Sequence, residues 1–593
     1  MRTRCQAKGG EPTSFMLAPC AVRATEFAAA YVDSSSCPNT SASDSSRQMM
    51  NSQGWFCRAG VMPTARLLAS AAACAVALCL ALRYKRRRIT AAPGGEHSDR
   101  RRPSKPVPYS PALLHRLALE HGTPYQLYDE EGIRNNTRRL LAAFQRYFPG
   151  FRQHFAVKAL PNPAVLRVLV EEGCGLDCSS PAELHIAQVV GCRAEHICYT
   201  SNYTPTADLV SACCAGVVVN LDDGSLVDAL AAALAGSGDT SVPKSAGSTS
   251  TRSFPDLISF RLNPGVGRTD STTISNCLAG PDAKFGVSPA NIVDAYRSAM
   301  RCGAKRFGMH MMTGSCVLSD AYWVESVGRI LDVVASVRAE LGIEFEFINI
   351  GGGLGIPYRP QCAAVDVEAL AQRIHTTMVR KCAEHGMPKP TLHMENGRYM
   401  TGPFGWLVTR VQVQCSEPHM NAGPCNLLCV GLPQAVKESF GQRYNGVDAC
   451  MAHLMRPGMY GAYHHISVVP RVGATPRKSL VGGVQPTATK PTWAETHVVG
   501  SLCENNDWFA KGRLLPPLGV GDLLVVHDCG AHAHSMGFQY NGSLRAPELL
   551  VRDCAARDGA EEASDDVCAT VSVIRTRETF ASLFGNCPSY TEA

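Results

Sequence analysis

The sequence predicts a fold of the class α/β plus all-β, in which a (β/α)8 barrel is followed by a β-domain. Three observations lead to this prediction. Short β-rich runs alternate with helical patterns between about residues 130 and 395. After residue 395 the helical periodicity largely stops, and strand-like runs take over. The chain has 593 residues, more than one domain needs, so we expect two or three units.

The barrel prediction depends on eight short runs that have the composition of strands. They cover residues 151–157, 174–179, 196–201, 217–221, 257–263, 306–312, 345–350 and 391–395. Helical patterns separate most of them, as at 163–172, 181–190 and 320–341. Eight strands that alternate with helices are typical of a (β/α)8 barrel, although a doubly wound open sheet fits the same alternation.

The β-domain is predicted from residues 396–593 together with 108–129, which supply an N-terminal strand. Runs at 405–413, 522–527 and 570–574 have the pattern of strands, and we expect a Greek-key-like barrel. Two Gly-, Ser-, Pro- and Thr-rich stretches are predicted insertions. One, at 236–255, interrupts the barrel, and the other, at 472–493, interrupts the β-domain.

Residues 1–107 are predicted to be a mostly disordered leader, rich in Ser, Ala and Arg. Within them, 67–82 (LLASAAACAVALCLAL) is apolar and uncharged. This run is shorter than the roughly 20 residues that span a bilayer. It is therefore a signal-peptide core, a marginal anchor, the start of an organelle-targeting region, or part of an unstructured leader. Membrane contact is expected only through this run.

Charge and cysteine content limit the partners and the compartment. Much of the net charge of +6 lies in two short runs, 84–88 and 100–105, which form a local basic patch, so we expect no nucleic-acid partner. The 26 Cys show no CxxC pair. This favours a reducing compartment, either the cytoplasm or an organelle such as a plastid.

Barrel enzymes carry their chemistry at the C-terminal ends of the strands. Lys158 ends the run HFAVK, and a desolvated lysine amine suits Schiff-base chemistry, although a snorkelling surface lysine is the simpler alternative. Gly351–Gly353 follow an apolar strand, where amides can approach a phosphate because no Cβ intervenes; a plain tight turn would look the same. Glu395 ends the last strand and is a candidate acid for a pyridine nitrogen, or a solvated loop carboxylate.

Eight motifs occur in the order seen in diaminopimelate decarboxylases. They are FAVKALPNPAVLRVL, CGLDCSSPAEL, DAKFGV, INIGGGLGIPY, ENGRYMTGPFGWLVTRV, RPGMYGAYHHI, GSLCENND and GAHAHSMGFQYNG. From about Gly122 to the C-terminus, outside the two insertions, the sequence resembles this family, a branch of the ornithine, diaminopimelate and arginine decarboxylases with fold-type III pyridoxal chemistry. The resemblance implies pyridoxal 5'-phosphate as cofactor. It also implies conversion of meso-2,6-diaminopimelate to L-lysine and carbon dioxide, the last step of lysine biosynthesis.

The resemblance also implies which residues hold the cofactor. Lys158 matches the lysine that binds it covalently, and Glu395 matches the acid at the pyridine nitrogen. The other expected cofactor residues lie around the phosphate or the ring: His310, Ser315, Gly351, Gly352, Gly353, Arg398 and Tyr540.

A further set is implied for the substrate, an amino acid. It consists of Arg398, Arg456, Tyr460, Glu504 and Tyr540. Cys503 matches a catalytic proton donor supplied across a dimer interface, so the resemblance implies a homodimer with shared active sites. No metal is expected, because His527, His532 and His534 match a structural segment of the β-domain.

Two positions depart from the family pattern. Asn396 stands where proline is usual, which leaves the neighbouring charged residues intact. Met312 stands where a ring-stacking histidine is usual. A thioether can pack on an aromatic face but cannot hydrogen bond as an imidazole does. His310, on the same strand face, is the candidate to replace that histidine.

Three other functions remain open at this point. A relative that acts on ornithine, arginine or carboxynorspermidine would share the cofactor residues. A racemase of the same fold would not need the LCEN segment. A non-catalytic regulator derived from a decarboxylase typically loses cofactor ligands, whereas Lys158, Gly351–Gly353 and Glu395 are all present.

Overall fold

The computed structural model describes residues 104–236, 253–267, 278–412, 436–439, 442–471, 493–552 and 569–590. The apolar run 67–82 and all but the end of the predicted leader lie outside these residues, as do most of the two predicted insertions. Within the described ranges, no helix is both long enough and apolar enough to cross a membrane.

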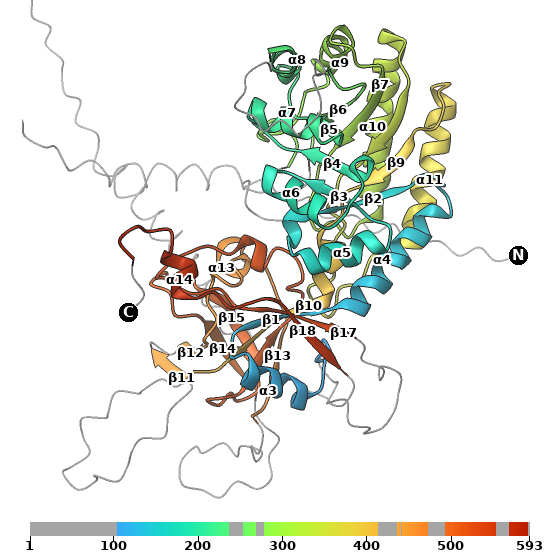
Figure 1. Ribbon diagram of the computed structural model, residues 1–593. Helices are drawn as coiled ribbons and strands as arrows, with labels where there is room; N and C mark the ends of the chain where they lie inside the picture. The colour runs from blue at the N-terminus through green and yellow to red at the C-terminus, as the bar shows by residue number, and fades with distance from the viewer. Residues whose placement is uncertain are drawn as a thin grey trace, which may run out of the picture. The chain divides into compact units, whose positions relative to one another are not determined.

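The predicted barrel is confirmed. Its eight strands pair in parallel and in chain order, from β2 to β9, and close on each other, which excludes an open doubly wound sheet (Figure 1). Each predicted run contains one observed strand. The strands are β2 (Arg152–Ala156), β3 (Gly175–Cys178), β4 (Ile197–Thr200), β5 (Val218–Leu221), β6 (Leu257–Leu262), β7 (Arg306–Met311), β8 (Phe345–Asn349) and β9 (Thr391–Met394).

Helices follow or precede the barrel strands and cover them from outside (Figure 1). Two begin with a polar cap followed by proline: Asn162 accepts a hydrogen bond from the Ala164 amide, and Ser180 from the Glu183 amide. Proline suits the first helical position because no amide is needed there. The helices are α4 (Glu130–Gln145), α5 (Pro163–Glu171), α6 (Pro181–Val189), α7 (Thr206–Cys214), α8 (Leu226–Gly236), α9 (Ile292–Arg301), α10 (Asp320–Leu341) and α11 (Val367–Glu384).

A six-stranded and a four-stranded sheet form the β-domain, in the orders β13-β16-β10-β1-β17-β18 and β11-β12-β14-β15. The predicted N-terminal strand is confirmed as β1 (Tyr125–Asp129), which pairs with β10 and β17 (Figure 1). The other strands are β10 (Gly405–Arg410), β11 (Val436–Ser439), β12 (Gln442–Gly446), β13 (Ile466–Val469), β14 (Ala494–Val499), β15 (Trp508–Leu515), β16 (Leu523–Val526), β17 (Glu548–Arg552) and β18 (Thr570–Arg575). Further helices are α3 (Pro111–Glu120), α12 (Arg398–Thr401), α13 (Arg456–Tyr460) and α14 (Phe580–Phe584).

Residues of the β-domain hold the barrel turn that carries Lys158. The carbonyl of Ala159 accepts hydrogen bonds from the His532 amide, at 2.9 Å, and from the Ser535 hydroxyl, at 3.1 Å. The fully buried Glu548 accepts a hydrogen bond from Asn162, which caps the helix after this turn. The position of Lys158 therefore depends on both parts of the fold.

The described chain begins with a segment that is anchored by a buried ion pair. Lys105 Nζ lies 2.5 Å from Asp528 Oδ2, and the Asp528 side chain is only 4% exposed. Burial raises the pKa of Asp528 to about 6, although Lys105 opposes this rise. Removing one partner from such a pair leaves a buried charge without compensation.

Deletion of residues 1–104 keeps Lys105 and should leave stability unchanged, whereas Lys105→Met should lower the free energy of unfolding by about 3 kcal/mol at pH 8. The loss should be smaller at pH 5. The folded-state pKa of Asp528 is raised, so the cost of its charge is absent at low pH and grows as the pH rises through the folded pKa. Thermal unfolding at both pH values measures this, with Lys105→Arg as the charge-conserving control. Equal losses at pH 5 and pH 8 would contradict it.

Candidate active site

Lys158 lies in a short 3-10 turn, Val157–Ala159, directly after β2. Its amine donates a hydrogen bond to Asp177 Oδ2 at 3.1 Å, and its side chain is 53% exposed, so it reaches into an open part of the barrel mouth. Partial desolvation lowers the pKa of Lys158, but the charges of Asp177 and Glu395 more than offset this and raise it above its ordinary value. The amine is therefore held as an ammonium by two carboxylates.

Asp177 is the nearer of these carboxylates, on β3, and its side chain is 1% exposed. Burial raises the pKa of Asp177, and the charge of Glu395 acts in the same direction, while Lys158 opposes both. Among the described residues Asp177 Oδ1 has no hydrogen-bond partner. Buried oxygens without a partner are rare in folded proteins, and a catalytic role is one of the reasons for them.

Glu395 follows β9 and is buried with both carboxylate oxygens engaged. His310 Nε2 lies 3.0 Å from one oxygen, and Asn349 Nδ2 donates to the other at 2.7 Å. Burial raises the pKa of Glu395, but His310 and Lys158 outweigh it and keep the pKa below its ordinary value. Glu395 is thus ionised, and because a carboxylate only accepts, His310 Nε2 carries the hydrogen.

His310 was expected to contact the cofactor and to replace a ring-stacking histidine. In the structure its side chain is 1% exposed and its Nε2 is engaged with Glu395. Met312 directly follows β7, with Sδ 2.9 Å from the position that a Cβ on Gly351 would take. Met312 therefore lies against the glycine loop, and His310 supports the acid.

The glycine loop Gly351–Gly353 has no space for side chains. A Cβ on Gly352 would lie 2.1 Å from the carbonyl oxygen of Glu395, and one on Gly353 2.1 Å from that of Gly314. Gly351 and Gly353 also have positive φ angles, of 68° and 106°. Among the described residues the amides of Gly352 and Gly353 have no acceptor, and the exposed Ser315 lies beside them.

Two buried asparagines fix this loop to the strands around it. Asn349 Oδ1 accepts a hydrogen bond from the Gly351 amide, so Asn349 links the loop to Glu395. Asn396 Oδ1 accepts from the Leu354 amide at 3.1 Å. The Asn396 side chain also donates a hydrogen bond to Gln153 Oε1 on β2, the strand that leads to Lys158, and the Asn396 carbonyl accepts one from Gln153 Nε2. Asn396, which departs from the family pattern, thus connects the glycine loop to β2, the strand that precedes Lys158.

These groups fit the cofactor that the resemblance implies, pyridoxal 5'-phosphate. Free amides in a loop without Cβ atoms suit a phosphate. An ionised, buried acid suits a protonated pyridine nitrogen, and Lys158 lies with its amine in the open mouth of the barrel.

Arg398, at the start of α12, and Arg456, at the start of α13, both donate hydrogen bonds to the hydroxyl of Tyr358. Among the described residues no carboxylate pairs with either guanidinium by an ion pair. His532 is near both arginines and Lys158: burial lowers its pKa well below the ordinary value, and these three charges act in the same direction. Gly397, which precedes Arg398, lies against Ala159, which follows Lys158: a Cβ on Gly397 would lie 2.6 Å from the Ala159 Cβ. Arg398 and, through Tyr358, Arg456 therefore lie beside the turn that carries Lys158.

The remaining predicted residues form a second group in the β-domain. Tyr540 donates a hydrogen bond to the carbonyl of Cys503, and the Cys503 amide donates to Asn541. Glu504 accepts a hydrogen bond from the Asn506 amide. In the described part of the chain, none of the hydrogen bonds of Cys503, Glu504 or Tyr540 reaches the barrel, and all three side chains are exposed. Tyr460, at the end of α13, is 38% exposed.

The histidines of the segment 527–534 separate in the structure. His527 Nε2 contacts the Ser467 hydroxyl, and His534 Nδ1 contacts Arg545, while His532 lies near Lys158. Over the described ranges, no group of three or more His, Cys, Asp or Glu side chains is arranged to hold a metal ion.

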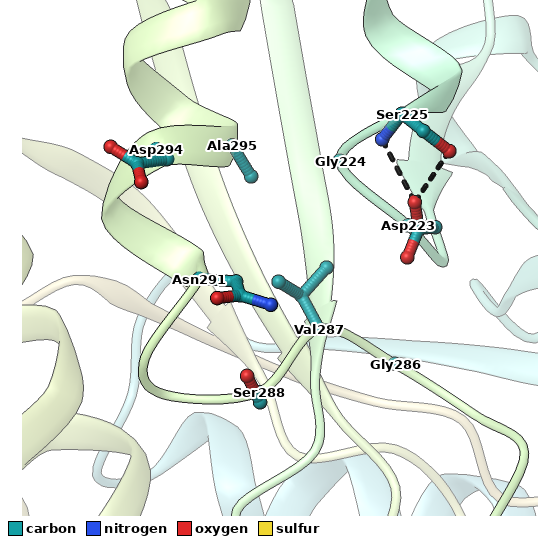
Figure 2. Close-up of a pocket in the computed structure, with 9 residues that line it drawn as sticks. All are labelled: Asp223, Gly224, Ser225, Gly286, Val287, Ser288, Asn291, Asp294 and Ala295. Atoms are coloured by element: carbon teal, nitrogen blue, oxygen red, sulfur yellow. Dashed lines mark hydrogen bonds between the residues drawn. The ribbon is translucent and has the colours of Figure 1, made fainter.

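A cavity of about 450 Å³ lies elsewhere, between the loop after β5 and the start of α9 (Figure 2). Asp223 accepts hydrogen bonds there from the amide and hydroxyl of Ser225, and Asn291 and Asp294 line the other side. None of the predicted site residues lines it. We therefore assign the chemistry to the mouth around Lys158.

Sequence reasoning missed Asn349, Tyr358 and His532 as site residues. A signal existed for Asn349, because it is a polar residue within an apolar run, two positions before the first glycine. Tyr358 and His532 had no such signal, since their role depends on how the β-domain packs on the barrel.

Asn396→Ala should lower the affinity for pyridoxal phosphate and reduce stability by about 3 kcal/mol, because Gln153 and the Leu354 amide lose buried partners. Cofactor titration and thermal unfolding measure the two effects. Asn135→Ala, at an exposed position on α4, is the control. Unchanged cofactor affinity in a destabilised protein would mean that Asn396 does not position the loop.

Comparison with known proteins identifies the family of the chain. Two family models match the chain: the pyridoxal binding domain of pyridoxal-dependent decarboxylases over residues 134–402, and their C-terminal sheet domain over 399–530. Protein TabA of Pseudomonas amygdali pv. tabaci is 39% identical over 441 residues, which are 74% of this chain and 89% of that protein. Diaminopimelate decarboxylase of Methanothermobacter thermautotrophicus is 34% identical over 470 residues, 79% of this chain and 92% of that protein.

Solved structures agree with these relatives. Diaminopimelate decarboxylase from M. jannaschii, in complex with L-lysine, superposes with a TM-score of 0.62 at 26% identity and covers 80% of this chain and 94% of that one. The fold thus agrees with the sequence relationship. The chain belongs to the pyridoxal-dependent decarboxylases that include the ornithine, diaminopimelate and arginine decarboxylases, and its cofactor is pyridoxal phosphate.

Proposed function

We propose that the enzyme decarboxylates meso-2,6-diaminopimelate to L-lysine and carbon dioxide. The observation that carries this proposal is the pair Arg398 and Arg456, two guanidinium groups at the site that share one neutral hydroxyl. Arg456 is buried and Arg398 is half-buried. Buried cations without an acidic partner require an anion from elsewhere.

The chemistry of the candidate substrates identifies that anion. Diaminopimelate carries an amine and a carboxylate at each end, so lysine keeps one carboxylate after the other has left. Ornithine and arginine have only the carboxylate that leaves. A guanidinium that bound the leaving group would stabilise the ground state rather than the transition state. The arginine pair is therefore useful for a carboxylate that survives the reaction.

Protein TabA has a name that states no substrate, but other relatives support the same substrate. The archaeal enzymes at 34% and 26% identity are named diaminopimelate decarboxylases, and one of them was solved with L-lysine. With this substrate, the reaction is the last step of lysine biosynthesis.

The residues can then be given roles. Bound pyridoxal phosphate supplies an electron sink for the electron pair left when the carboxylate departs. Lys158 would hold the cofactor, Glu395 would keep the ring nitrogen protonated, and the Gly352 and Gly353 amides would hold the phosphate. Arg398 and Arg456 would hold the distal carboxylate and orient the substrate.

A proton must replace the lost carboxylate, and Cys503 is the proposed donor. Within one chain its loop makes no hydrogen bond to the described barrel residues, and Tyr540, which donates to the Cys503 carbonyl, is 43% exposed. Met459 and Tyr460, also in the β-domain, are 56% and 38% exposed. Such an exposed apolar and aromatic face suits a second copy of the chain. We propose a homodimer in which Cys503 Sγ of one subunit delivers the proton in the site of the other, where Glu504 would bind the distal ammonium.

Lys158→Ala should abolish lysine release from meso-diaminopimelate and the yellow colour of the purified protein, with little loss of stability because the side chain is partly exposed. Lysine release and visible absorption measure this, with Lys305→Ala at an exposed position as the matched control. A wild-type enzyme that releases carbon dioxide from ornithine or arginine but not from meso-diaminopimelate would overturn the proposed substrate. A Lys158→Ala variant that still forms a borohydride-reducible adduct would show that Lys158 is the wrong residue.

Mixing inactive Lys158→Ala with inactive Cys503→Ala under conditions of subunit exchange should restore activity. With equal amounts and random exchange, half of the dimers are mixed, and each has one intact site, so about a quarter of wild-type activity is expected. Mass spectrometry of labelled subunits confirms exchange. If exchange occurs and no activity returns, Cys503 acts in the site of its own subunit.

A further inference from the structure

Tyr358 lies after the glycine loop and is half-buried between the barrel and the β-domain. Its hydroxyl oxygen accepts hydrogen bonds from Arg398 Nη1 and, at 2.8 Å, from Arg456 Nη1. The Arg456 guanidinium lies 4.8 Å from the centre of the Tyr358 ring, and that of Arg398 lies 5.7 Å from it. One tyrosine therefore joins a cation of the barrel to a cation of the β-domain.

His464 holds Arg456 from another direction. Its Nε2 lies 2.8 Å from Arg456 Nη1, and its Nδ1 lies 2.7 Å from the carbonyl oxygen of His527. A carbonyl only accepts, so Nδ1 carries the hydrogen and Nε2 accepts from the guanidinium. Burial lowers the pKa of His464 well below its ordinary value, and the charge of Arg456 acts in the same direction. The arginine thus has two neutral neighbours that fix its orientation.

The Tyr358 hydroxyl and the two guanidiniums have more hydrogen-bond donors than acceptors. A tyrosine oxygen has two lone pairs, and the two guanidiniums use both. Its own hydrogen remains, and among the described residues it has no acceptor. The remaining N–H groups of both arginines are also donors. The group therefore presents donors and positive charge, and it requires an anion that can accept several hydrogen bonds at once, as a carboxylate does.

We propose that Tyr358 is a specificity-determining residue whose hydroxyl holds Arg398 and Arg456 side by side as a clamp for the carboxylate that the substrate keeps. This inference rests on the proposed function and adds a residue to it. Without the hydroxyl, two like charges would lose their common acceptor and separate, and the carboxylate would lose one donor and a preorganised pair.

The test compares two ligands that differ by the carboxylate alone. L-Lysine carries the carboxylate, and cadaverine is the same diamine without it. Tyr358→Phe in the holoenzyme should weaken L-lysine binding about tenfold or more, which is the loss of one charge-assisted hydrogen bond. The dissociation constants of cadaverine and of the cofactor should change by less than about twofold, and so should the equilibrium constant for unfolding. Tyr463→Phe is the matched control, because Tyr463 is a β-domain tyrosine that stacks on Arg359 and Arg513 instead.

The outcomes separate the alternatives. Equal losses for lysine and cadaverine would show a general structural role and overturn the clamp. A loss of cofactor affinity with unchanged lysine binding would assign the arginines to the phosphate and also overturn it. Because binding needs no turnover, the substrate is tested separately. A wild type that binds lysine about tenfold more tightly than Tyr358→Phe does, yet releases none from meso-diaminopimelate, would refute the proposed function and leave the clamp intact.

Discussion

The charge of one buried carboxylate, Glu395, is the constraint around which the active site is built. A buried acid stays ionised only when its oxygens are hydrogen-bonded and opposite charges lie close. His310 and Asn349 bind the two oxygens, and Lys158 adds a positive charge nearby. Asn349 also binds the Gly351 amide, so the acid and the glycine loop share one support. The spacing between the ring-nitrogen acid and the phosphate loop is thereby fixed before any ligand binds, which is how preorganised sites avoid reorganisation during the reaction.

The barrel mouth is completed by the β-domain. The turn of Lys158 is held through Ala159 by His532 and Ser535, and Arg456 is brought to Tyr358 from α13. A barrel alone would keep Glu395 and the glycine loop. It would lose the hydrogen bonds that hold the turn of Lys158, and the site would lose Arg456. This division agrees with the match of both domain models, which meet near residue 400.

The eight barrel strands and the N-terminal strand of the β-domain were predictable, because apolar runs bounded by turn residues persist at every one of them. Residues at strand ends, such as Lys158 and Glu395, were predictable for the same reason. Tyr358 was not, because it contacts Arg456, which lies 98 positions further along the chain. His464 lies only 8 positions from Arg456, but no periodic pattern relates the two residues. Asn396 was identified in the sequence only as a departure from the family pattern. Its role was not predictable, because its contact with Gln153 joins residues 243 positions apart. Such contacts are set by tertiary packing, which local periodicity does not record.

A crystal structure of the protein with pyridoxal phosphate and L-lysine tests the central claim most directly. We predict that Glu395 hydrogen bonds to the ring nitrogen while it keeps its contacts with His310 and Asn349. The lysine carboxylate should lie between Arg398 and Arg456, against the Tyr358 hydroxyl. A cofactor whose ring nitrogen faces another residue, or a lysine carboxylate bound away from the two arginines, would contradict it.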